Sequence, residues 1–141
     1  MCLNIRKIDK EISIRLKLIS IQKEKLFLLE KELAEEYFHK KENFKGKNQR
    51  IKMMQYSICK VRELLERLSP ENEERKLTLE KLISKRSNSL IELESESQEI
   101  SKEKHEIIQK IVKIRKQMEQ LRIYEEKLIE YSRSIDIINL N

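Results

Sequence analysis

The chain has 141 residues, of which 40% are charged, 38% hydrophobic and 5% aromatic, with one Gly, one Pro and no Trp. Turns rely on Gly, Pro, Asn and Asp, so this composition excludes the many turns of an ordinary globular enzyme domain and leaves long helices. The net charge of +6 is compatible with a soluble chain that favours acidic partners, and two cysteines, Cys2 and Cys59, are too few for a disulfide framework, which indicates a cytoplasmic location.

The first half of the chain predicts one helix over residues 4–68. Its most apolar stretch, residues 12–21, is interrupted by Arg15 and Lys17, so neither a signal peptide nor a membrane span is expected. Apolar residues recur along this helix at the three- and four-residue steps of a coiled coil. They are Ile5, Ile8, Ile12, Ile19, Leu26, Leu29 and Leu33, followed by Ile51, Met54, Ile58, Val61, Leu65 and Leu68.

The same helix carries a second apolar row, formed by Ile14, Leu18, Ile21 and Leu28. At about 100° per residue, this row lies on the other side of the helix from Ile5 and cannot share one intramolecular contact with it. A contiguous apolar strip exposed to water usually marks an interface, whereas isolated exposed apolar residues are ordinary. We therefore expect the row to bind a partner.

The apolar pattern is interrupted between Leu33 and Ile51, where it advances by 18 residues, or two heptads plus four. The lone glycine, Gly46, lies in this interval, and Gly weakens a helix by about 1 kcal/mol relative to Ala. We therefore expect a kink, break or locally unwound turn near Gly46.

Residues 40–52 are strongly basic, with Glu42 as their one acidic residue. Such a run suggests nucleic-acid binding. It lacks a series of interleaved aromatic residues of the kind that stack on bases, however, and in a hairpin it would face residues 88–100, which contain four Glu and no Lys or Arg. We interpret it as a charge pattern that pairs the two helices and expect no nucleic-acid partner.

Residues with catalytic or metal-binding potential are few. His39 and His105 would lie near each other in a hairpin, but two histidines among surface glutamates do not make a four-ligand zinc site. Cys59 lies near the apolar row and is interpreted as a small buried hydrophobe. A two-helix protein also offers no pocket that excludes water from a carboxyl group. We expect no enzyme activity, no metal and no cofactor.

A turn is expected at residues 69–72, where Ser69 can cap a helix and Pro70 suits a first helical turn. The second helix is predicted over residues 70–138. Its apolar residues follow a sustained heptad pattern. They are Leu79, Ile83, Leu90, Leu93, Ile100, Ile107, Ile111, Ile114, Met118, Leu121, Leu128 and Ile135.

If the second helix folds back on the first, facing residues have position numbers that add up to a constant of about 140, as Ile12 and Leu128 do. Arg15 then falls opposite Glu125, and an ion pair between them would help to fix the register. The sequence therefore predicts an all-α fold, a single long antiparallel two-helix coiled-coil hairpin over residues 1–141.

A basic, Gly-poor coiled-coil hairpin with both termini at one end resembles the central-stalk proteins of type III secretion systems, the FliJ, YscO and SpaM group. Residues 114–124 are similar in character to the charged C-terminal helix of that group. The resemblance implies a stalk, not itself an enzyme, whose terminal end enters a hexameric secretion ATPase. Further implied partners are the export gate or secretion chaperones, at the inner membrane without insertion into it. Candidate contacts beside the apolar row are Arg6, Lys7, Arg122 and Arg133.

Two other classes remain open. A prefoldin-like chaperone or tether is also a coiled-coil hairpin, but it needs β-hairpins at the turn, and residues 62–80 contain no alternating β-branched run. A self-assembling rod would join the second apolar rows of two hairpins in a four-helix bundle. The rod uses the same residues as docking to an ATPase, so the sequence does not separate the two.

Overall fold

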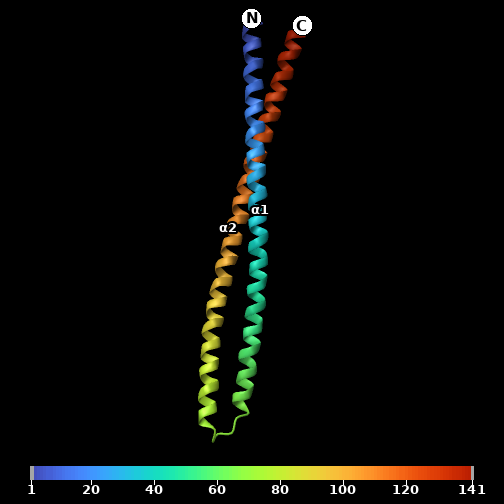
Figure 1. The fold of residues 1–141 in the computed structure, drawn as a ribbon. Coiled ribbons are helices and arrows are strands. Elements are labelled where there is room, and N and C mark those ends of the chain that lie inside the picture. Colours follow the sequence, from blue (N-terminus) through green and yellow to red (C-terminus); the bar gives the residue numbers. More distant parts are fainter. Residues whose placement is uncertain (1, 141) are drawn as a thin grey trace. The chain divides into compact units, whose positions relative to one another are not determined.

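The computed structural model describes the backbone of residues 2–140 and the side chains of residues 4–138. Helix α1 spans Cys2–Glu66, helix α2 spans Glu73–Leu140, and the two lie antiparallel as a hairpin (Figure 1). The predicted fold class is therefore confirmed. Contacts divide the chain into two compact units: unit 1 comprises Met1–Glu36 and Ile107–Asn141, and unit 2 comprises Tyr37–Glu106.

The connection between the helices is longer than predicted. Helix α1 ends at Glu66, and the backbone N–H of Asn72 donates to the carbonyl of Ser69 at 3.1 Å, which closes a turn. The Asn72 carbonyl then accepts the first helical hydrogen bond, from the N–H of Lys76 at 3.1 Å. Asn72 therefore occupies the N-cap position that the sequence had suggested for Ser69, because Pro70 is used inside the turn. Glu73 and Glu74 form the acidic first turn of α2, which suits the helix dipole.

The core of unit 1 is the apolar row that the spacing predicts. Ile12, Ile19, Leu128 and Ile135 form one buried cluster, and other apolar residues pack against it. These partly buried residues are Ile5, Ile8, Leu16 and Leu121. Side chains from both helices are buried at three- and four-residue steps. This is the arrangement of an antiparallel coiled coil, in which the core positions are labelled a and d.

Buried and half-buried residues recur along α1 at regular steps from Ile12 to Leu65, with Leu16 as the first a position and Ile19 as the next d position. Leu29 is exposed, and its neighbour Glu30 is half-buried at the a position instead. The apparent insertion between Leu33 and Ile51 therefore does not exist. It arose because polar residues fill core positions there and because Leu29 was counted as a core residue.

Gly46 does not interrupt α1. The helix continues through it, and a Cβ atom added there would meet no atom within 4 Å. The expected break or unwound turn is therefore wrong. Without a half-heptad to absorb, the coiled-coil pattern needs no irregularity at this position, and a single Gly costs a long, packed helix only about 1 kcal/mol.

Unit 2 has a more polar interior than unit 1. Lys40 and Lys47 occupy d positions of α1, and their ammonium groups pair with Glu103 and Glu96 of α2. Ser97 is the one buried polar residue among the described side chains, and its hydroxyl donates to Asn48 Oδ1 at 3.0 Å. Each of these contacts joins the two helices, so the pairing of unit 2 rests in part on hydrogen bonds and ion pairs.

The ion pair predicted between Arg15 and Glu125 is wrong. Glu125 pairs with Lys23 at 2.7 Å, whereas Arg15 bonds to Glu11 of its own helix at 3.0 Å and to the Tyr124 hydroxyl at 3.1 Å. The reason is the position of Arg15 beside the core row, next to the core residue Leu16, while Lys23 lies in that row one heptad beyond Leu16. Lys23 therefore reaches the carboxylate that lies within the helix interface.

Candidate functional site

The second apolar row of α1 faces away from α2. Ile14, Leu18, Ile21 and Leu28 expose 51%, 55%, 49% and 53% of their surfaces, whereas Ile19 between them exposes only 3%. In heptad terms, Ile14, Ile21 and Leu28 are at f positions and Leu18 is at a c position, which are the positions farthest from the a and d core. We name these four residues the outer stripe. All four belong to unit 1, which also contains both ends of the chain.

Apolar f positions are unusual in a two-helix coiled coil, because these positions normally carry charged residues that face water. The corresponding face of α2 in unit 1 has Ile123 exposed, with Lys116 and Glu130 one heptad to either side. The outer stripe is therefore a property of α1 and offers a continuous apolar surface to a partner.

The four predicted cationic contacts are distributed over both helices. Lys7 is exposed at an f position, one heptad before Ile14, and so lies in line with the outer stripe. Arg6 is also exposed on α1 but lies at an e position, and Arg133 is exposed on α2. Of the four cations, the structure places only Lys7 on the face of the outer stripe.

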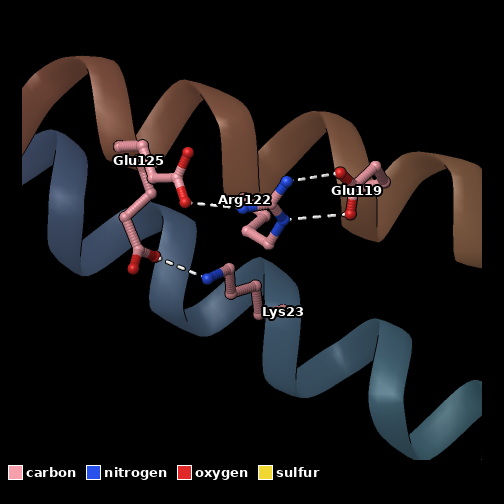
Figure 2. A network of polar contacts seen from close by, with 5 residues as sticks. Lys23, Glu119, Arg122 and Glu125 are labelled. Atoms are coloured by element: carbon pink, nitrogen blue, oxygen red, sulfur yellow. Dashed lines mark hydrogen bonds and ion pairs between the residues drawn. The ribbon is translucent and has the colours of Figure 1, made fainter.

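Arg122 is held by carboxylates of its own helix. Its guanidinium donates to both carboxylate oxygens of Glu119, at 2.6 and 3.0 Å, and to Glu126 at 2.5 Å (Figure 2). Figure 2 also shows Lys23 of α1 reaching Glu125 beside this network. Because two carboxylates neutralise Arg122, its charge is less available to a partner than the charge of Lys7.

The Arg122 network makes a prediction about pH. Hydrogen bonds from Arg122, more than its charge, lower the pKa of Glu119 below its ordinary value of 4.5. A carboxyl whose pKa is lower in the folded state stabilises the fold above its unfolded pKa, and this contribution is lost as the pH falls through the folded pKa. In the Arg122→Gln variant we expect the Glu119 pKa to return toward 4.5. Carboxyl NMR titration of both proteins measures the difference, and an unchanged Glu119 pKa would contradict the assignment.

Part of the basic run over residues 40–52 forms a basic flank on unit 2, where the sequence predicted that the whole run pairs with α2. Lys41, Lys45, Lys52 and Lys104 line a surface groove of about 640 Å³, together with Phe44 and one acidic residue, Glu42. The Lys104 ammonium lies 4.3 Å from the centre of the Phe44 ring. The predicted match with the acidic residues of 88–100 therefore holds for Lys47, whereas Lys40 pairs with Glu103, outside that range. No ion pair joins Lys41, Lys45 or Lys52 to any described side chain. The basic flank could have been recognised from Lys104, because Lys104 falls at the same heptad position as Ile111, a residue predicted for the core.

Cys59 is exposed, so its interpretation as a buried hydrophobe is wrong. It follows the buried residue Ile58 and points away from the core, as a b position requires. Among the described residues, no three or more His, Cys, Asp or Glu side chains gather in a group that could hold a metal ion. Within the same part of the chain, no helix has the length and hydropathy needed to cross a membrane.

Comparison with family models, curated proteins and solved structures gives no significant match to the chain. Any assignment of function must therefore come from the surface of the hairpin. The outer stripe is the feature of that surface that most clearly indicates an interface, because the exposure of four large apolar side chains in a row to water is unfavourable.

Proposed function

We propose that the chain is a non-enzymatic central stalk that binds a hexameric secretion ATPase through the outer stripe and couples it to the export gate. The observation that carries the proposal is the exposure of the outer stripe on the unit that contains both ends of the chain. A helical hairpin can place such a surface against a ring of subunits, and the resemblance to type III secretion stalks gives the class of ring.

The proposed mechanism is coupling through unequal contact. A hairpin with an apolar face on only one helix touches the subunits of a symmetric ring differently, according to which subunit the outer stripe faces. Contact that favours one subunit conformation shifts the population toward that conformation, and so changes the hydrolysis cycle of that subunit. In this scheme the hairpin hydrolyses no nucleotide.

The double variant Leu18→Glu/Ile21→Glu is expected not to bind the ATPase. Two carboxylates in the outer stripe would have to be desolvated on docking, which costs several kcal/mol. The measurement is affinity purification of the tagged full chain from its host, with mass spectrometry and an assay of nucleotide hydrolysis by the recovered hexamer. Circular dichroism should be unchanged, because both residues are solvent-exposed and outside the core.

The matched control is Ile123→Glu, which makes the same kind of change at an exposed apolar position on α2. This variant should still bind the ATPase and stimulate its nucleotide hydrolysis. Recovery of the ATPase with the double variant would refute docking through the outer stripe. Failure of the unmodified chain to recover or stimulate any hexameric ATPase would refute the stalk proposal itself.

A further inference from the structure

The outer stripe is the centre of a longer heptad pattern. Continuing its f and c positions in both directions gives alternating steps of four and three residues. This spacing is that of a coiled-coil interface, although the face does not contact α2. The positions are Lys7, Glu11, Ile14, Leu18, Ile21, Lys25, Leu28, Glu32 and Glu35.

The two ends of this pattern have opposite charge. Lys7 precedes the apolar block, and Glu32 and Glu35 follow it. Within the described part of the chain, none of these three side chains has an ion-pair partner, and all three are exposed. The same holds for Lys17 and Glu24, which flank the apolar block on the f side, at b positions.

We infer that in the free protein the outer stripe packs against the outer stripe of a second copy, with the two α1 helices antiparallel. A two-fold axis between Leu18 and Ile21 brings Leu18 beside the second copy's Ile21. Ile14 then falls opposite the carbon stem of the second copy's Lys25, with the second copy's Leu28 one turn away. The interface is isologous, so each contact occurs twice and the pairing closes on itself as a dimer.

The charges select this direction. In the antiparallel arrangement Lys7 lies near Glu32 and Glu35 of the second copy, and Lys17 lies near the second copy's Glu24. In a parallel arrangement Lys7 would face Lys7, and Glu35 would face Glu35. Opposite charges beside an apolar contact set helix orientation in coiled coils, and like charges oppose it.

The dimer concerns the chain alone and does not rest on the proposed function. If the proposed function also holds, the second copy and the ATPase compete for one surface, and the dimer must dissociate before the stalk docks. Competition of this kind reduces the apparent affinity for the ATPase by the fraction of chain held in the dimer. The outer stripe would then not be exposed while the chain awaits its partner.

Sedimentation velocity of the full chain tests the dimer. The unmodified chain is expected at twice its mass of 17.1 kDa at micromolar concentration. Leu18→Glu/Ile21→Glu should sediment as a monomer with the same circular dichroism, and the control Ile123→Glu should remain a dimer. A monomeric unmodified chain, or a dimer that survives the double substitution, would overturn the inference. Recovery of an ATPase is a separate measurement, so the two proposals can fail separately.

Charge reversal tests the direction of pairing. Lys7→Glu alone and Glu35→Lys alone should each raise the dimer dissociation constant by roughly tenfold, because two attractive contacts become repulsive. The combined variant, Lys7→Glu/Glu35→Lys, should return it to within about threefold of the unmodified value. In a parallel dimer each reversal would replace one like-charge contact by another. Equal affinities for all four proteins would therefore overturn the antiparallel arrangement.

Discussion

Replacing Ile19 by Ala is expected to lower the free energy of unfolding by about 2–5 kcal/mol, the range for truncating a buried Ile. Ile19 exposes 3% of its surface and lies in the buried cluster of unit 1 with Ile12, Leu128 and Ile135. In a two-helix core each side chain has neighbours on only one partner helix. Little surrounding structure can therefore move in to fill the space that the truncation leaves.

The matched control is Ile21→Ala, two residues further along the same helix, where the side chain is 49% exposed. This substitution should change stability by less than about 0.5 kcal/mol, and Ala has the higher helix propensity. Both variants should carry Leu18→Glu, so that pairing of copies does not contribute. Urea unfolding followed by circular dichroism measures the two values. Similar losses at both positions would show that the core and the outer stripe have been assigned to the wrong faces.

The spacing of apolar residues was sufficient to predict the fold. Every apolar residue predicted for the core of the second helix is buried or half-buried in α2, because Ile, Leu and Met at three- and four-residue steps have one face to bury. The exposure of Ile14, Leu18, Ile21 and Leu28 followed from the same reasoning, since a helix has only one face toward its partner. Which other protein the outer stripe binds depends also on the surface of that protein, which this sequence does not contain.

Two of the errors share a physical origin, which is the presence of polar residues at core positions. Glu30, Lys40 and Lys47 interrupt the apolar pattern of α1, so their positions were not recognised and a half-heptad insertion near Gly46 was inferred in its place. Long Lys and Glu side chains can occupy such positions because their carbon stems pack while their charges reach solvent. The pairing of Lys23 with Glu125 was missed for the same reason.

The start of α2 was misplaced because several residues between 69 and 72 can cap a helix. Ser69 and Asn72 are both good N-cap residues, and Pro70 fits a first turn as well as it fits a tight connection. The structure uses Asn72 as the cap and leaves Ser69 to accept the hydrogen bond that closes the turn. The sequence alone did not decide between these two local solutions of similar energy.

The polar interior of unit 2 leads to the prediction that Lys47→Leu/Ser97→Leu stabilises the hairpin. The side chain of Lys47 is 20% exposed and Ser97 exposes 7%, so both new Leu side chains would be largely removed from water. Burying a Leu side chain contributes about 1.5–3 kcal/mol, whereas the ion pair and the hydrogen bond that are lost contribute about 1 kcal/mol each. The net gain should be roughly 1–4 kcal/mol, or a rise in Tm of about 3–15 °C.

The control is Glu96→Gln, which removes the ion pair with Lys47 and leaves the core positions as they are. Because the Glu96 side chain is 54% exposed, this change should alter Tm by no more than about 2 °C. Thermal unfolding followed by circular dichroism measures both variants. A fall in Tm for Lys47→Leu/Ser97→Leu would show that the polar contacts stabilise unit 2 more than Leu packing can. A rise would instead indicate that they are retained to fix the register, since apolar core positions alone permit the helices to pair one heptad out of place.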